Sequence, residues 1–250
     1  MKAIFITVRS SSTRLPNKCF RKIKERHTIE YVIDRAKRST LADCVVLCTT
    51  QLAVDDRLCD IAEKNGILYF RGSEEDKLER WRGACDKFGI EFFVTADGDD
   101  LFCDPGLMDQ ALAQFENNKD ENDFIKSDDV ICGAFTYGIK ASALRKVCKI
   151  KKTTDTEMMW VYFTDTGLFS VKKLDNIDPK FIRSDIRMTM DYEEDLKFFT
   201  KVLDNFENTD YTLHDIVDFI DKSPDVKQIN FHRHQEWAQN QRSKTKLVVV

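Results

Sequence analysis

The sequence predicts an α/β protein in which helices cover both faces of a mostly parallel sheet. Short apolar runs rich in β-branched and aromatic residues, typical of strands buried on both faces, alternate with amphipathic segments over the first hundred residues. This alternation is the pattern of three-layer folds with a parallel sheet. At 250 residues and 42% hydrophobic content, we expect residues 1–250 to form a single domain, with a helical C-terminal extension from about residue 206.

The first half contains the clearest elements. One predicted helix places Ile29, Val32 and Ile33 on one face, and a second ends at Gly89, a residue that favours helix termination. The strands are predicted at 2–8, 44–50, 67–70 and 91–97, and the two helices at 28–38 and 73–89.

The second half is less regular, and we expect its strands to be antiparallel additions to the sheet. The stretch "FHRH", residues 231–234, is predicted to be a surface strand or loop. The other predicted strands cover 133–139, 166–171 and 185–190, and the predicted helices cover 141–147, 192–206 and 212–222.

Composition argues against several classes of function. Lysine and arginine total 39 against 43 acidic residues, without a long basic block, so we expect no nucleic-acid partner. No apolar run reaches about 18 residues and no signal-peptide core is present, so we expect a cytoplasmic protein without a membrane partner. The eight cysteines show no C-x-x-C pair, which predicts reduced and mostly buried thiols.

The loop "RSSSTRLPNK" directly follows the first strand. Ligands of open parallel sheets bind beyond the carboxyl ends of the strands, which makes this loop a candidate site. Its hydroxyls and backbone N–H groups could cradle phosphate oxygens while solvent-facing Arg14 and Lys18 neutralise charge. The alternative is a solvated turn. The further candidate phosphate-binding residues are Arg9, Ser10, Ser11, Ser12 and Thr13.

The stretch "VTADGDDLFCDP" ends another strand with several carboxylates. Asp97, Asp99 and Asp100 would repel one another unless a cation or basic partner is present. Mg²⁺ suits such a place, because it binds one or two carboxylates and keeps positions for substrate phosphates. Alternatively the aspartates occupy a turn, and for Asp104 we predict a cap on the helix beginning at Pro105.

The stretch "IRMTMDYEEDL" is a third candidate. If residues 186–191 form a strand, Arg187, Thr189 and Asp191 share one face, which would be a site. The alternative is a structural ion pair between Arg187 and Asp191. Asp195 is predicted to be a charge at a helix N-terminus.

The stretch "YFRGSEEDKLERW" is a weaker candidate. Gly72 permits a sharp turn, and Ser73 is a natural N-cap three residues before Asp76. Local structure accounts for most of this pattern.

Taken together, "VRSSSTRLPNKCFRKI", "TTQLAVDDRL", "YFRGSEEDKLERW", "TADGDDLFCDP" and "IRMTMDYEEDL" resemble a known set of motifs in order and spacing. The set is that of the cytidylyltransferase family of the spore-coat polysaccharide type. More distantly, the chain resembles the synthetases of CMP-3-deoxy-manno-octulosonate and CMP-sialic acid. The resemblance covers roughly residues 2 to 205.

The resemblance implies a nucleotide-diphospho-sugar transferase fold of the Rossmann-like kind, and commonly a homodimer. It implies Mg²⁺-dependent transfer of CMP from CTP to an acidic sugar or related acceptor, with release of pyrophosphate. By position, Asp97 and Asp191 would hold the metal, and Arg187 could bind an anionic group of the acceptor. Arg9, Ser12, Arg14 and Lys18 would bind the triphosphate, and Arg71, Gly72 and Ser73 would line the nucleoside side.

Two departures from the family pattern leave alternatives open. The loop glycine is Asn17 here, which is compatible with a positive φ. The family's D-C-P-L is replaced by Asp97-Gly98-Asp99-Asp100-Leu101, so Asp97, Asp99 or Asp100 could be the metal ligand. A non-sugar acceptor with a phosphate or phosphonate group, or a non-catalytic nucleotide-binding role, remain the alternative functions.

Overall fold

A mixed seven-stranded sheet forms the centre of the computed structural model, which describes residues 1–12 and 14–249. Thr13, one of the predicted phosphate-binding residues, lies outside the described residues. Only β8 runs antiparallel to its neighbours, so the predicted mostly parallel sheet is confirmed. In spatial order the strands are β5 (Leu68–Gly72), β4 (Cys44–Thr50), β1 (Lys2–Thr7), β6 (Phe92–Asp97), β8 (Tyr137–Lys140), β7 (Phe124–Lys126) and β9 (Val171–Lys173).

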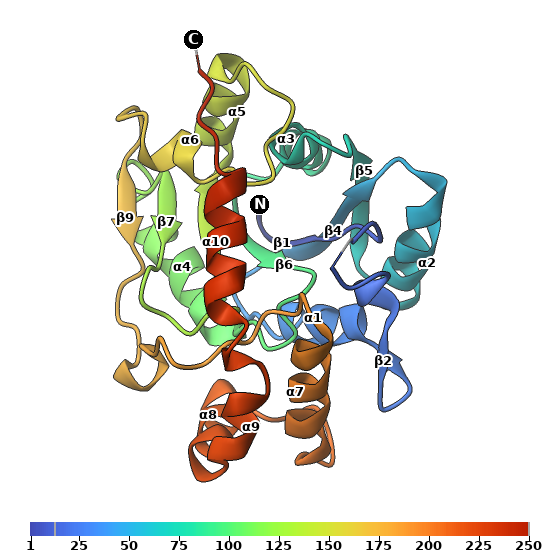
Figure 1. Cartoon of the computed structure of the whole chain (residues 1–250). Coiled ribbons are helices and arrows are strands. Elements are labelled where there is room, and N and C mark those ends of the chain that lie inside the picture. Colours follow the sequence, from blue (N-terminus) through green and yellow to red (C-terminus); the bar gives the residue numbers. More distant parts are fainter. Residues whose placement is uncertain (13, 250) are drawn as a thin grey trace.

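Helices cover both faces of the sheet, as Figure 1 shows. Alternate residues of β1 enter two separate cores: Ile4 and Ile6 pack on one face, and Ala3 and Phe5 on the other. The first core includes α1 (Thr28–Ala36), α2 (Asp56–Lys64) and α4 (Pro105–Asn117), and the second includes α3 (Lys77–Phe88), α5 (Ala141–Ile150) and α6 (Val161–Thr164). The three-layer prediction is confirmed, whereas α2 was not predicted.

The C-terminal part is helical. Two of its helices, α7 (Glu193–Asp204) and α8 (Leu213–Lys222), match the predicted ones. The prediction of a surface strand or loop for "FHRH" is correct only for its centre: residues 232–233 form a turn between α9 (Pro224–Phe231) and α10 (His234–Lys244), and no strand forms there. Helix α10 crosses in front of the sheet in Figure 1, and the chain then runs toward α5.

The predicted strand at 185–190 is also wrong. This segment forms no strand and makes only an isolated bridge, between Cys132 and Arg187. The backbones at Gly133 and Met188 lie very close together. A Cβ added to Gly133 would come within 2.0 Å of the Met188 carbonyl oxygen. Gly133 has φ +90°, a conformation that side chains disfavour. Instead of a ladder, separate backbone hydrogen bonds hold the segment: the N–H of Met188 donates to the carbonyl of Cys132 at 2.8 Å, and the N–H of Met190 donates to the carbonyl of Asp99 at 3.0 Å.

Short elements complete the part of the chain that the structure describes. They are η1 (Lys18–Phe20), β2 (Lys22–Ile23), β3 (Arg26–His27), η2 (Ala53–Asp55) and η3 (Pro179–Phe181). Across residues 1–12 and 14–249, no helix combines the length and the apolar character needed to cross a bilayer.

Candidate active site

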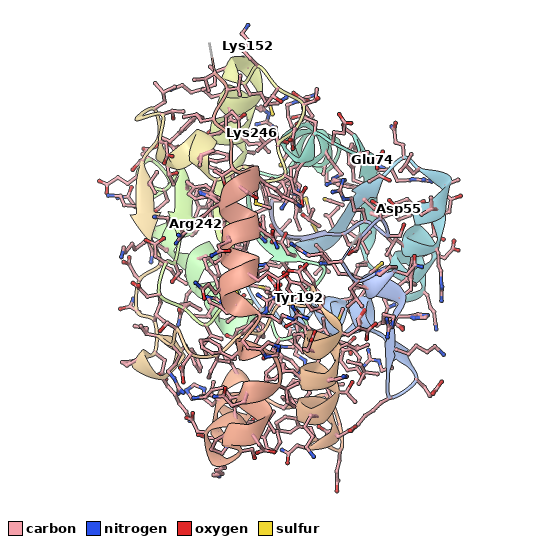
Figure 2. The ribbon with its side chains drawn as sticks, in the orientation of Figure 1. Asp55, Glu74, Lys152, Tyr192, Arg242 and Lys246 are labelled. Carbon is pink, nitrogen blue, oxygen red and sulfur yellow. The ribbon has the colours of Figure 1, made fainter. Side chains whose placement is uncertain are left out.

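A large cavity lies at the carboxyl ends of β1 and β6. Its volume is about 1390 Å³, above the roughly 300–1,000 Å³ of most small-molecule pockets. Figure 2 shows Glu74 on the side of β5 and Arg242 on α10, and both residues line the cavity. Its walls come from the loop after β1, the turns after β5 and β6, the segments 127–137 and 182–191, and α10.

Two backbone features bring the strand ends together. The N–H of Gly98 donates to the carbonyl of Thr7 at 2.9 Å, and a Cβ on Gly98 would lie 2.6 Å from the Cβ of Val8. Glycine is therefore required where the loops after β1 and β6 touch. Asn17 adopts φ 54°, the left-handed conformation that its sequence position suggested, and η1 begins at the next residue, Lys18.

Lys18 stands at the centre of the charged groups. Its Nζ donates to Asp99 and, at 3.0 Å, to Oδ1 of Asp191. Arg14 donates to the same Asp191 oxygen at 2.7 Å. The Lys18 side chain is only 17% exposed and that of Asp191 only 3%, so the expectation that Lys18 faces solvent is wrong. These hydrogen bonds connect the loop after β1 with the segment before α7, which lie more than 170 residues apart in the sequence.

The surrounding charges set the protonation of these groups. Burial alone would raise the pKa of Asp191, but the charges and hydrogen bonds of Lys18 and Arg14 outweigh it and lower the pKa to about 2. Burial likewise opposes the charge on Lys18, yet Asp99 and Asp191 raise its pKa above the usual value. Both groups are therefore charged at neutral pH.

Asp97 and Asp100 differ in exposure. The Asp97 side chain is 31% exposed and lies 3.3 Å from Nζ of Lys77, a cavity cation that sequence reasoning missed. Asp100 is 6% exposed, and burial together with the charges of Asp99 and Asp97 raises its pKa well above the usual range. Asp100 is thus the least accessible of the three aspartates to a metal ion.

The donor set fits Mg²⁺. Within the described residues no three or more His, Cys, Asp and Glu side chains form a ready metal cluster, but Mg²⁺ usually takes only one or two carboxylates from the protein. Burial and the charges of Asp191 and Asp97 disfavour the ionised form of Asp99 and raise its pKa, even though Lys18 opposes them. A divalent cation would relieve this repulsion.

Arg187 does not face the cavity, so its predicted place in the site is wrong. The side chain is buried and donates from Nε and Nη2 to the two oxygens of Asp195, at 3.0 and 3.1 Å. Asp191 lies 3.5 Å away, so the ion-pair alternative is closer to the observed arrangement. Because no strand forms here, the alternation of faces does not apply. The Trp237 ring lies 5.0 Å over the guanidinium.

Asp195 does more than charge a helix N-terminus. Its Oδ2 accepts hydrogen bonds from the backbone N–H groups of Asp191 and Tyr192, at 2.8 and 2.9 Å. Asp195 therefore fixes the backbone that presents Asp191 to Lys18. Arg187 supports the site through Asp195.

None of the three residues predicted to line the nucleoside side, Arg71, Gly72 and Ser73, is among those that line the cavity. Arg71 lies outside it, with Nε and Nη2 donating to the carbonyls of Thr50 and Leu52 at 2.9 and 2.8 Å. Ser73 accepts from the N–H of Asp76 at 3.1 Å, and Asp76, not Ser73, is the N-cap of α3. Gly72 packs against Arg80. The following residues, Glu74 and Glu75, line the cavity instead.

The opening loop divides into two parts. Arg9, Ser11 and Ser12 line the cavity together with Arg14 and Lys18. Ser10 turns inward, where its N–H and hydroxyl both donate to Oδ1 of Asp55, at 2.8 and 2.6 Å. Its side chain is therefore committed to holding the loop on η2. The phosphate-binding roles of the cavity-facing residues stay predictions.

Sequence reasoning also missed a whole wall of the cavity. Most residues of α10 border the cavity, yet none of them is buried. Figure 2 shows Tyr192 beside this helix, and its hydroxyl accepts from Nδ2 of Asn240 at 3.3 Å. A helix that is polar on all sides has no apolar stripe to announce it in the sequence.

Known proteins resemble this chain over almost its full length. The family model described as Cytidylyltransferase matches residues 3–235. The chain is 29% identical over 240 residues to an uncharacterized protein of Methanocaldococcus jannaschii, covering 94% of this chain and 97% of that protein. It is 26% identical over 230 residues to the spore coat polysaccharide biosynthesis protein SpsF of Bacillus subtilis, covering 88% and 94%.

A solved structure agrees with these relatives. The cytidylyltransferase from Leptospira borgpetersenii superposes with a TM-score of 0.83 at 26% identity, covering 91% of this chain and 96% of that one. Fold, motifs and matched length therefore lead to one conclusion. The chain belongs to the cytidylyltransferase family, and it is a nucleotidyltransferase.

Proposed function

We propose that this enzyme transfers CMP from CTP to an acidic sugar or related small acceptor and releases pyrophosphate, in the biosynthesis of a surface polysaccharide or glycoconjugate. The observation that carries the proposal is the meeting of Arg14 and Lys18 on Asp191, in a cavity that Asp97 also lines. The name of SpsF, a spore coat polysaccharide biosynthesis protein, supports the pathway class. The acidic sugar is the acceptor class that the motif resemblance implies.

The proposed chemistry needs positioning and charge neutralisation more than covalent catalysis. An acceptor oxygen attacks the α-phosphorus in line, and negative charge grows on the departing pyrophosphate. Arg14 and Lys18 would bind the phosphates and neutralise that charge, while Ser11 and Ser12 offer hydroxyl donors. The cavity, at about 1390 Å³, has room for a nucleotide and an acceptor side by side.

Asp97 and Asp191 would hold Mg²⁺, with Asp99 as the neighbouring alternative. When bound, the metal would supply charge stabilisation at the α-phosphate and lower the pKa of the acceptor hydroxyl. Asp191 is kept ionised by Lys18 and Arg14, which prepares its carboxylate for that role. We further propose a homodimer and a cytoplasmic location. A phosphate- or phosphonate-bearing acceptor is the second candidate.

The test is a pyrophosphate-release assay. CTP, UTP, ATP and GTP are each supplied with and without Mg²⁺ over a panel of acidic sugars and of phosphate- and phosphonate-bearing acceptors. We expect release only with CTP, Mg²⁺ and one acceptor class. Release with all four nucleotides, or full activity in EDTA, would contradict the proposal.

A further inference from the structure

Helix α10 turns one face toward the cavity. Four half-buried residues at helical spacing line the cavity: His234, Trp237, Ala238 and Gln241. Three exposed residues on the opposite side of the helix do not line it: Gln235, Gln239 and Ser243. The inward face of a surface helix normally packs on an apolar core, whereas the inward face of α10 borders a cavity.

Polar contacts near its two ends hold α10 in place. Before the helix begins, Arg233 donates to Glu194 at 2.9 Å. At its last residue, Lys244 lies 3.6 Å from Glu157. Partly exposed ion pairs of this kind contribute little stability, so packing does not explain why the helix crosses the cavity.

Two polar side chains of α10 line the cavity without a protein partner. Gln241 uses its backbone carbonyl to accept from the Thr245 hydroxyl at 2.9 Å, while its side-chain amide makes no hydrogen bond to the described residues. Arg242 is exposed, and its guanidinium makes no hydrogen bond or ion pair within residues 1–12 and 14–249. Glu236 and Lys244, by contrast, are both ion-paired. An amide and a guanidinium are therefore available to a ligand in the cavity.

The helix also passes beside the proposed reacting groups. Asn240 donates to the hydroxyl of Tyr192, the residue after Asp191, at 3.3 Å. The Arg14 guanidinium lies 5.6 Å from the centre of the Tyr192 ring. Figure 2 shows Tyr192 beside α10 and Arg242 on the same helix. A molecule lying along α10 would therefore have one end near Asp191, where the acceptor oxygen and the phosphates meet in the proposed reaction.

The family match favours the acceptor as the ligand of α10. The match covers residues 3–235 and so ends at the second residue of the helix. Arg14 and Lys18, the proposed phosphate ligands, lie inside it. CTP is the substrate that cytidylyltransferases have in common, so we expect shared residues to bind it. A helix outside the matched stretch suits the acceptor, the substrate that differs from one enzyme to another.

We propose that α10 recognises the acceptor, with Arg242 binding its anionic group and Gln241 binding its hydroxyl groups. This inference rests on the proposed function. The planar guanidinium matches two oxygens of a carboxylate or a phosphonate, and an amide both donates to and accepts from hydroxyl groups. Both candidate acceptor classes carry such an anionic group. Gln241 and Arg242 are thus specificity-determining residues.

The test compares Arg242→Gln and Gln241→Ala with matched controls. Gln239→Ala removes the same amide from the exposed side of the same helix, two residues away. Arg145→Gln removes an arginine that lies outside the cavity, paired with Asp86 at 2.9 Å.

Pyrophosphate release is measured with Mg²⁺ and saturating CTP while the acceptor concentration is varied. The probes are 3-deoxy-manno-octulosonate, sialic acid and 2-aminoethylphosphonate. Dissociation constants for CTP with Mg²⁺ are measured by calorimetry without acceptor, and melting temperatures are measured without ligand.

We expect Arg242→Gln to raise the acceptor KM roughly tenfold or more, the value of one charge-assisted contact. Gln241→Ala should raise it roughly threefold or more, since a neutral hydrogen bond is weaker. In both variants kcat and the dissociation constant of CTP should stay within about twofold of the parent, as for the loss of a binding contact made only to the acceptor. The melting temperatures should not change, because neither side chain is buried. Both controls should match the parent in every measurement.

The outcomes separate the two proposals. If the parent releases no pyrophosphate with any of the three probes, the proposed function fails. If the parent is active and neither variant raises the acceptor KM above that of its control, α10 does not recognise the acceptor and the inference is overturned. Weaker CTP binding by both variants at an unchanged acceptor KM would assign the helix to the nucleotide and overturn it as well. The probe whose KM rises in Arg242→Gln identifies the anionic group as a carboxylate or a phosphonate.

Discussion

Replacing Lys18 by methionine removes the cation between Asp99 and Asp191 while keeping an unbranched side chain of similar length. Removing one partner of a buried ion pair costs about 3–5 kcal/mol. In the variant, Asp191 keeps its ion pair with Arg14 at 2.7 Å, and Asp99 can take up a proton. Both effects reduce the loss of unfolding free energy. We therefore expect the free energy of unfolding to fall by about 2–3 kcal/mol at pH 7, or roughly 4–12 °C in melting temperature.

The pH dependence gives this prediction a second signature. Without Lys18, the pKa of Asp99 rises further in the folded state, because burial already raises it and its main opposing charge is gone. A carboxyl whose pKa is raised in the folded state destabilises the fold at pH values above that pKa. It has no effect on stability below the pKa of the unfolded chain, about 3.9. The deficit of Lys18→Met should therefore be larger at pH 7 than at pH 5 and should shrink as the pH falls toward about 4.

Urea unfolding followed by tryptophan fluorescence, at pH 7 and pH 5, measures both effects. Lys22→Met is the control, since Lys22 and its partner Glu25 are 51% and 93% exposed; its effect should stay within about 0.5 kcal/mol. A Lys18→Met variant as stable as the parent at pH 7, or one whose deficit is independent of pH, would refute the argument that Lys18 holds two carboxylates together.

Three further predictions concern activity and support of the site. Asp97→Asn should lower turnover roughly a hundredfold or more. Asp100→Asn should lower it much less, because Asp100 is only 6% exposed and is poorly accessible to a metal ion. Equal losses in the pyrophosphate assay would reassign the ligand. Arg187→Met should lower the free energy of unfolding by about 3–5 kcal/mol, because it leaves the Asp195 carboxylate without its cation. A higher KM for the acceptor at unchanged stability would instead place Arg187 in the active site. A chain ended after residue 233 lacks α10 and should stay folded, losing about 1 kcal/mol or less of unfolding free energy in a urea titration, because α10 contains no buried residue. Its kcat/KM should fall roughly tenfold or more. Full activity would show that the cavity wall formed by α10 is dispensable.

The sequence predicted the first half of the sheet well because its signal is local. Each strand from β1 to β6 that enters the central sheet is a short apolar run, and α1 and α3 have apolar faces at helical spacing. Helix α2 was missed although its inward residues, among them Leu58 and Ile61, follow the same spacing. That pattern was present and could have been found.

The site was predicted in part. The residues after β1 and β6 meet because parallel strands end at one edge of the sheet. The segment before α7 was placed on a strand that does not exist, since a two-residue alternation in sequence resembles a strand whether or not a partner pairs with it. Arg187 was assigned to the cavity for this reason.

What the sequence by itself determined is the layered fold, the motif order that marks a cytidylyltransferase, and the choice of charged residues at the strand ends. What only the tertiary structure decided is the environment of those charges. Lys18 is buried because Asp191, 173 residues later, is brought against it. Arg80 is buried although its Nε finds no hydrogen-bond partner among the described residues. Local pattern fixes which residues form a strand or helix, whereas burial and pairing depend on contacts between distant segments, which no short stretch of sequence contains.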